Sequence, residues 1–430
     1  MDTVIKAKKL IDGSGSVPVD DPVVVVRDTK IIGVYQGEVP EKILSTDAQT
    51  LEYPESTLLP GLIDCHVHLN LPGDGTEFVD SVAEPDGFLV ATSAYNARTA
   101  LEAGITTLRD TGGRGSTTFE LRRALQHGYG TGSRLILCGQ PITITGGHTW
   151  YFGGEADGVE GVRQKAREMV KLGADFIKVM GTGGGTPGTI SWLPSFRREE
   201  IEAVIDEAHR LARKISIHCL CAEAIEFAAE AGVDQIEHAS FLVNEAGAQK
   251  FVPAVADTIA RSGAMVTGTL AVGSYVVSTM RAKERRTREE QELLDRWEIM
   301  LEDNLRQFSG LLQAGVQFVA GTDAGWRFTP FDSLVEEMHL MQSGDLATAE
   351  AIVAATSRAA RALGIESEVG TVQEGFGADI IAVDGDPLED LYALKKVRMV
   401  MQAGHVHVHR EHARSQPVSV PSSPAAAMSN

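Results

Sequence analysis

Hydrophobic and polar positions follow different patterns in three parts of the chain. Residues 1–57 contain short runs rich in valine and isoleucine, such as VVVVRD and KIIGVY, separated by glycine, proline and aspartate. This pattern indicates β-strands without helices. Residues near 366–410 contain similar runs, GADIIAVDGDP and KVRMVMQAGHVHV. We therefore expect the two ends of the chain to contribute strands to one sheet.

Between these ends, short apolar runs alternate with helical periodicity. Stretches such as REEIEAVIDEAHRLARK carry apolar residues three and four positions apart, as amphipathic helices do. Apolar strands alternating with helices predict an α/β fold with buried parallel strands. Eight such strands are the number that a closed (β/α)8 (TIM) barrel requires, and an open doubly wound sheet is the alternative. The eight runs are GLIDCHV, TTLRD, RLILCG, FIKVMG, ISIHC, QIEHA, MVTGTL and QFVAGTD.

Two segments depart from this pattern. Residues 274–307 include a highly charged helical run with many opposite charges four residues apart, which predicts a solvent-facing helix inserted after the seventh strand. A lid over a site is the other interpretation. The final segment, SQPVSVPSSPAAAMSN, has a composition typical of disorder. The predicted division is sheet at 1–57, barrel at 58–365, the rest of the sheet at 366–412, and a disordered tail at 413–430.

The amino-acid composition limits the classes of partner that the protein is expected to bind. The chain has 39 Lys and Arg against 59 Asp and Glu, a net charge of −20, which argues against nucleic acid because phosphate binding needs clustered cations. We find no apolar window long enough for a membrane span and no apolar leader in MDTVIKAKKLIDGSGSV, so we expect no membrane association and a cytoplasmic location. The four cysteines lie in apolar runs, which favours buried thiols over disulfides.

Polar residues stand in or at the ends of the predicted strands, where barrel enzymes place catalytic side chains. Alternation along a strand directs His66 and His68 to the same side. His218 and His238 are 20 residues apart, which fits one helix between neighbouring strand ends. Imidazole and carboxylate groups suit zinc, manganese or cobalt. The candidate metal ligands are His66, His68, Lys178, His218, His238 and Asp323.

Lys178 lies in the middle of the apolar strand FIKVM, where a charged amine would suffer a large desolvation penalty. One interpretation is a core lysine that reaches a distant carboxylate. The other is that the neutral amine combines with carbon dioxide to form a carbamate, whose two oxygens can bridge two cations. The carbamate would also remove the buried positive charge.

The segments PGLIDCHVHLN, FIKVMGTGG, SIHC, IEHAS, GTDAG and EGFGADIIAVDGDPLED together resemble the amidohydrolase superfamily, specifically its binuclear members with a carboxylated lysine. GITTLRDTGG and CAEAIEFAAEAGVDQIEHAS are most similar to the branch that contains prolidase-like dipeptidases, Xaa-Arg/Lys carboxypeptidases and ochratoxin-type amidohydrolases. The resemblance implies a (β/α)8 barrel with a small β-sandwich built from both termini. It also implies two divalent metal ions, with zinc favoured and manganese or cobalt as alternatives. His66, His68 and Asp323 would bind one ion, His218 and His238 the other, and carboxylated Lys178 would bridge both.

The resemblance further implies a hydrolase of an amide-type C–N bond in an N-acyl amino acid, a dipeptide or a xenobiotic amide. A metal-bridging hydroxide would be the nucleophile and Asp323 the proton shuttle. Carbamate or phenylurea hydrolysis, cyclic-amide hydrolysis as in imidazolonepropionase, and mononuclear deamination are alternatives, and a metal-free, non-enzymatic barrel is a further one. A homo-oligomer is the expected assembly.

Two bulky loops indicate substrate contacts. His148 follows a Gly-Gly turn after the third strand, which suits a contact with a substrate carbonyl and makes it the second expected catalytic residue. Loop aromatic residues predict an apolar portion in the substrate, although they often pack only against one another, and Arg327 suits a carboxylate. The glycine-rich segment at 181–188 predicts a mobile loop over the site. The predicted substrate contacts are His148, Trp150, Tyr151, Trp326 and Arg327.

Overall fold

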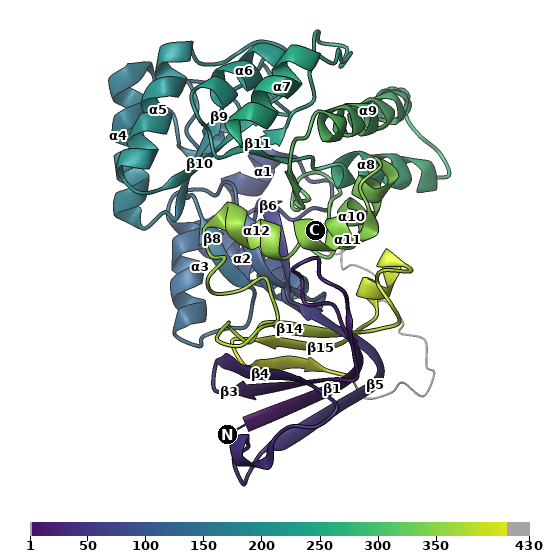
Figure 1. The fold of residues 1–430 in the computed structure, drawn as a ribbon. Coiled ribbons are helices and arrows are strands. Elements are labelled where there is room, and N and C mark those ends of the chain that lie inside the picture. The colour runs from purple at the N-terminus through teal and green to yellow at the C-terminus, as the bar shows by residue number, and fades with distance from the viewer. Residues whose placement is uncertain (1, 411–430) are drawn as a thin grey trace, which may run out of the picture.

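Strands from both ends of the chain form one eight-stranded sheet in the computed structural model, which describes residues 2–410 (Figure 1). The strand order is β16 (His405–His409), β15 (Val397–Gln402), β14 (Ile380–Asp384), β5 (Gln49–Pro60), β1 (Asp2–Leu10), β3 (Pro22–Arg27) and β4 (Lys30–Gln36), with β2 (Val19–Asp20) paired to β1. β14 runs antiparallel to β5, whereas β5 runs parallel to β1. Buried Ile5, Val24 and Ile380 contribute to one apolar core for this sheet. The predicted tail at 413–430 lies outside the described residues.

Eight parallel strands lie in the remainder of the chain, at the positions of the eight predicted runs. Three of them form one sheet and five form another. Isolated parallel bridges connect the two sheets at Val67–Ala324 and join the segment after the third strand to the next strand at Ile142–Val179. The fold is therefore α/β, with parallel strands between helices. In spatial order the strands are β6 (Leu62–Val67), β7 (Ile105–Asp110) and β8 (Arg134–Leu137) in one sheet, and β9 (Phe176–Met180), β10 (Lys214–Cys219), β11 (Gln235–His238), β12 (Met265–Thr267) and β13 (Phe318–Val319) in the other.

Helices surround these parallel strands and lie apart from most of the eight-stranded sheet (Figure 1). Their buried faces are apolar, as the periodicity predicts; α4, for example, buries Val162, Ala166 and Met169. The helices are α1 (Phe78–Ala83), α2 (Asp86–Glu102), α3 (Thr117–Gln126), α4 (Gly158–Leu172), α5 (Arg198–Arg210), α6 (Ala222–Glu230), α7 (Pro253–Ser262), α8 (Ala271–Ala282), α9 (Arg288–Gln313), α10 (Leu334–Ser343), α11 (Thr348–Ala354) and α12 (Ser357–Leu363). Short 3-10 helices are η1 (Glu41–Ile43), η2 (Trp150–Phe152) and η3 (Leu391–Lys395).

The charged run at 274–307 forms two helices, so the prediction of a single inserted helix is wrong. The break lies before α9, where the Thr287 hydroxyl accepts a hydrogen bond from the Glu290 N–H and the Glu290 carboxylate accepts one from the Thr287 N–H. This capping box fixes the start of α9. The helix is also not wholly solvent-facing, because Leu294 and Phe308 are buried.

All four cysteines, Cys65, Cys138, Cys219 and Cys221, are buried free thiols, as their apolar surroundings predict. Within residues 2–410, every helix is too short or too polar to cross a membrane.

Candidate metal and substrate site

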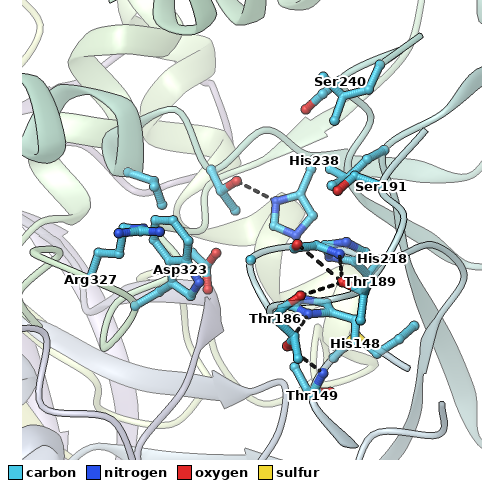
Figure 2. Close-up of a pocket in the computed structure, with 18 of the residues that line it drawn as sticks. His148, Thr149, Thr186, Thr189, Ser191, His218, His238, Ser240, Asp323 and Arg327 are labelled. Carbon is cyan, nitrogen blue, oxygen red and sulfur yellow. Dashed lines mark hydrogen bonds between the residues drawn. The ribbon is translucent and has the colours of Figure 1, made fainter. Parts of the chain in front are cut away.

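The six predicted metal ligands line one cavity of about 580 Å³ at the carboxyl ends of the parallel strands. Each is placed by a strand or by the turn that follows it: β6 carries His66 and directs His68, and β13 is followed by Asp323. Figure 2 shows Asp323 on one side of the cavity and His218 and His238 on the other. The six residues are His66, His68, Lys178, His218, His238 and Asp323.

The ligand atoms lie at separations that a metal ion could span. Oδ1 of Asp323 is 3.5 Å from Nε2 of His66 and 3.4 Å from Nε2 of His68. Ligand atoms of His66, His238 and Asp323 all lie within 4.8 Å of one another. The His218 and His238 rings have centroids 4.6 Å apart. The site thus contains two overlapping clusters, one around Asp323 and one around the pair of histidines on β10 and β11.

Two of these residues adopt a left-handed backbone conformation. His238 has a φ of 71° and Asp323 a φ of 60°. Such conformations are uncommon for residues other than glycine and cost on the order of 1–3 kcal/mol each. At Asp323 the N–H donates to the His66 carbonyl at 2.8 Å, which ties the strained turn to β6. The backbone strain is therefore located where the candidate ligands are aimed into the cavity.

Hydrogen-bond partners fix the tautomers of three histidines. Nδ1 of His66 contacts Oε2 of Glu237 at 2.8 Å, and Nδ1 of His68 contacts the Gly112 carbonyl at 3.1 Å. Nε2 of His218 contacts the Gly183 carbonyl, also at 3.1 Å. Carbonyl and carboxylate oxygens accept, so each of these nitrogens donates its hydrogen and the other ring nitrogen keeps its lone pair. In His68 that nitrogen, Nε2, also lies 3.4 Å from the Thr111 hydroxyl.

Burial keeps the candidate ligand histidines neutral. It is the main cause that lowers the pKa of His66 and of His68 to about 3, and it lowers the pKa of His218 and His238 well below the usual value. A neutral imidazole is the form that binds metal.

Lys178 is 1% exposed, and its Nζ has no hydrogen-bond partner among the described residues. Burial lowers the pKa of this amine, which favours the neutral form. The core-lysine interpretation required a carboxylate partner for Nζ, and the described residues supply none within hydrogen-bond distance. An unpartnered neutral amine fits the carbamate interpretation.

Oδ1 of Asp323 also lacks a hydrogen-bond partner, and burial raises the pKa of this carboxyl group to about 7. Neutral imidazoles, an unpartnered carboxyl oxygen and an unpartnered amine around one cavity form a donor set that suits divalent zinc, manganese or cobalt.

His148 lies in the same cavity, on the loop that precedes η2. Its ring centroid is 4.7 Å from that of His218, and its Nδ1 is 2.8 Å from the Thr186 hydroxyl. Burial lowers the pKa of His148 to about 3. The glycine-rich segment at 181–188 lies against this ring, and a Cβ on Gly184 would come within 2.5 Å of His148 Nε2. Glycine is therefore required there by the close approach of the loop.

Of the other predicted substrate contacts, Tyr151, Trp326 and Arg327 line the cavity. Trp150 does not belong to the lining and its side chain is 41% exposed. Its place in a 3-10 helix explains this, because successive side chains of a tight helix point in different directions. The structure instead places Trp192, which sequence reasoning missed, in the cavity wall.

Sequence reasoning favoured a solvated helix for the charged run and gave a lid as the other interpretation, but it named no cavity-lining residue on α9. Its residues Leu293, Trp297 and Met300 line the cavity. They are spaced four and three residues apart, so an apolar stripe within the charged run was the available signal.

Comparison with known proteins places the chain in a family. The amidohydrolase family matches residues 57–407, so the chain belongs to the amidohydrolase family. It is an enzyme, a hydrolase that acts on C–N bonds of small molecules.

Individual relatives are more distant. The chain is 28% identical to ochratoxinase of Aspergillus niger, over 93% of this chain and 84% of that protein. It is 25% identical to imidazolonepropionase of Rhizorhabdus wittichii, over 89% and 93% of the two chains. The crystal structure of a Xaa-Pro dipeptidase with bound methionine matches with a TM-score of 0.82 and 26% identity, over 95% of this chain and 100% of that one.

Proposed function

We propose that the protein is a metal-dependent hydrolase of amide bonds in N-acyl amino acids or dipeptides, substrates that carry a free carboxylate. The observation that carries the proposal is the convergence in one cavity of the four neutral histidines of the candidate ligand set, the unpartnered Nζ of Lys178 and the unpartnered Oδ1 of Asp323. Similarity to ochratoxinase and to a Xaa-Pro dipeptidase supports an amide substrate.

We infer that the eight parallel strands close into a (β/α)8 barrel, with a small β-sandwich formed by both ends of the chain. The bridges Val67–Ala324 and Ile142–Val179 support closure, because they join neighbouring strands across both gaps between the two parallel sheets. In such a barrel the carboxyl ends of the strands surround one site, which accounts for the convergence of residues from β6, β9, β10 and β11.

The donor set fits two divalent metal ions, with zinc favoured. His66, His68 and Asp323 would hold one ion, and His218 and His238 would hold the other. Lys178, as its carbamate, would bind to both ions. Bound ions of this kind polarise a carbonyl group and make water more acidic.

Asp323 would transfer the proton, and His148 would contact the substrate carbonyl. The Asp323 carboxylate would accept a proton from the attacking water and deliver it to the leaving nitrogen as the C–N bond breaks, which returns the carboxylate to its starting state. Thr186 Oγ1 accepts the Thr149 N–H at 3.0 Å, so its own hydroxyl hydrogen is free for His148 Nδ1. His148 Nε2–H would then donate to the substrate carbonyl oxygen.

Arg327 and its neighbours support a substrate with a carboxylate and an apolar portion. Arg327 lies over the Trp326 ring at 4.7 Å, and its Nε has no hydrogen-bond partner within the described chain. The Phe78 ring stacks on the Trp326 ring, with the two ring centroids 5.5 Å apart. A half-buried guanidinium group with a free donor suits a carboxylate, and the adjacent aromatic rings suit an apolar side chain.

The test combines metal analysis with a substrate panel. We expect about two metal ions per chain by elemental analysis, and chelator-sensitive cleavage of N-acyl amino acids or dipeptides in preference to aryl carbamates and ureas. Asp323→Asn should abolish turnover while the yield of folded protein is retained. Glu337→Gln, which alters a buried carboxyl group outside the cavity lining, is the matched control and should leave turnover intact. Activity that survives removal of all metal would contradict the proposal.

A further inference from the structure

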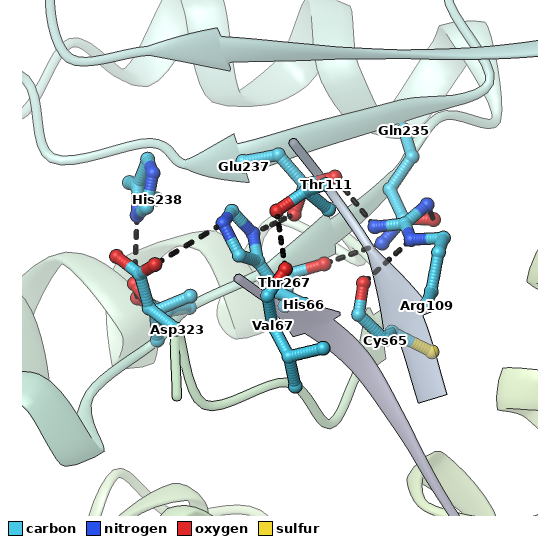
Figure 3. Close-up of polar contacts among 12 residues, drawn as sticks. Cys65, His66, Val67, Arg109, Thr111, Gln235, Glu237, His238, Thr267 and Asp323 are labelled. Atoms are coloured by element: carbon cyan, nitrogen blue, oxygen red, sulfur yellow. Dashed lines mark hydrogen bonds and ion pairs between the residues drawn. The ribbon is translucent and has the colours of Figure 1, made fainter. Parts of the chain in front are cut away.

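A buried polar network lies beneath the candidate ligands and ends on His66 (Figure 3). Arg109 of β7 donates to the Cys65 carbonyl at 2.5 Å, to Oε1 of Gln235 at 2.7 Å and to Oε1 of Glu237 at 2.6 Å. The second oxygen of Glu237 accepts from His66 Nδ1 at 2.8 Å. The network therefore connects three strands, β6, β7 and β11, through side chains that are almost wholly buried.

The geometry of the network leaves its members little freedom. Gln235 donates from Nε2 to the Thr267 hydroxyl, which directs its Oε1 toward Arg109. Arg109 in turn holds one oxygen of Glu237, so the other oxygen faces His66. A planar guanidinium with several fixed donors suits this task better than an ammonium group would.

His66 is distinct among the candidate ligand histidines because its partner is charged. His68 and His218 donate to backbone carbonyls, and Nδ1 of His238 is paired with the Thr269 hydroxyl at 2.7 Å. A carboxylate partner makes an imidazole a stronger electron donor than a carbonyl or hydroxyl partner does, and it also fixes the ring orientation.

Removing one member of such a buried ion pair would leave an uncompensated charge. The charges of Arg109 and Glu237 largely cancel, so this buried ion pair adds little net charge to the interior between the strands. Because a well-packed apolar pair would also fill this space, the retention of a charged pair is better explained by the histidine that it holds.

We propose that Glu237 and Arg109 are positioning residues that hold His66 with Nδ1 protonated and Nε2 aimed at Asp323, and thereby strengthen metal binding at the His66, His68 and Asp323 cluster. The inference rests on the proposed function only in that the cluster binds a metal ion. It assigns a role to two residues that do not touch the substrate.

The test is a titration of metal-depleted protein with zinc ions alone. Zinc affinity is measured by calorimetry or by competition with a coloured chelator. Glu237→Gln keeps the shape of the side chain but removes the charge, and we expect zinc affinity at one of the two sites to fall about 10–100-fold. Affinity at the site that contains His218 and His238 should change less. Equal zinc affinity in Glu237→Gln and the unaltered protein at both sites would overturn the inference.

The matched control is Glu207→Gln. Glu207 of α5 is also buried and held by arginines, accepting from Arg167 at 2.8 Å and from Arg163 at 3.1 Å, but these partners lie on α4. The Glu207→Gln substitution should lower thermal stability and leave zinc affinity unchanged. If both variants weakened zinc binding equally, general destabilisation would explain the effect and the positioning role would be wrong.

Arg109→Lys provides a second route if Glu237→Gln does not fold. A lysine keeps the charge but cannot reach all three acceptors, so we expect a smaller loss of zinc affinity in the same site; unchanged affinity would contradict the inference. Failure of the proposed function is distinguishable, because the unaltered protein would then bind no zinc, or would bind it without catalysing C–N cleavage.

Discussion

The ring of His148 lies 4.7 Å from the ring of His218, although the first residue belongs to a loop and the second to a strand 70 residues later. His218 is a candidate metal ligand, and His148 has its own partner in Thr186. A side chain in this position can contact a molecule bound at the candidate metal site without being a ligand itself.

We therefore expect His148→Asn to reduce kcat about 100–1000-fold, the loss typical of removing one donor to a developing oxyanion. Metal content should not change, because His148 is not needed to hold an ion. Thr186→Val, which removes the hydroxyl group that orients the His148 ring, should reduce kcat by a smaller factor. Thr186→Ser keeps the hydroxyl group, so its kcat should be close to that of the unaltered protein. Kinetic measurement beside elemental analysis checks this, and loss of metal from His148→Asn would make the residue a ligand instead.

Lys178→Met should lower metal content and abolish turnover, because methionine cannot form a carbamate. The free energy of unfolding should stay the same or rise, since an apolar side chain replaces a buried amine without a hydrogen-bond partner. Denaturant titration and elemental analysis together test this. A strongly destabilised variant that keeps its metal would indicate a structural lysine. In the unaltered protein, a carbamate signal in 13C NMR after incubation with labelled bicarbonate is the positive result.

Arg327→Met should raise KM for a substrate with a free carboxylate about 10–100-fold and have little effect on the matching carboxamide, since a charge-assisted contact is worth about 1.5–3 kcal/mol. Arg296→Met is the control: Arg296 also lines the cavity, but its guanidinium donates to the Glu245 carbonyl at 3.2 Å. Equal losses on the acid and the amide in Arg327→Met would mean that this arginine has only a packing role.

Glu337 should make the protein less stable as pH rises. Burial raises the pKa of its carboxyl group from 4.5 to about 8, and its Oε2 accepts the Ala271 N–H at 2.7 Å. Between these two pKa values the folded state holds a proton that the unfolded state has lost, so the free energy of unfolding falls as pH rises through this window.

Glu337→Gln cannot ionise and removes this contribution. Relative to the unaltered protein, the variant should gain about 4 kcal/mol in unfolding free energy between pH 5 and pH 9. Urea titrations of both proteins across this range measure the difference. A constant difference would show that Glu337 does not titrate in the window.

The strands, and the gathering of the candidate metal ligands at their ends, were predictable because both depend on local signals. A buried parallel strand is an apolar run, and a polar residue within or after such a run is conspicuous; His218 at the end of ISIHC and Asp323 at the end of QFVAGTD are examples. The helix break at Thr287 was also encoded locally, as a threonine followed three residues later by Glu290, but the charge pairs around it masked the signal.

The cavity wall was less predictable because it depends on packing between distant elements. Trp150 and Trp192 both lie in loop sequences, and only the three-dimensional arrangement decides which of them faces the cavity. The side-chain partners of Arg109, Gln235 and Glu237, are more than 100 residues away, so the sequence indicates a buried charge in TTLRD without indicating what neutralises it.

The pairing of β14 with β5 also determines when the protein can fold. β5 ends at Pro60, whereas β14 begins at Ile380, so about 320 residues separate two strands that share a ladder. During synthesis, β5 leaves the ribosome long before its partner and presents an unpaired edge until residues 380–384 follow. The eight-stranded sheet is therefore completed only once residues 380–409 have been translated, after all eight parallel strands have emerged.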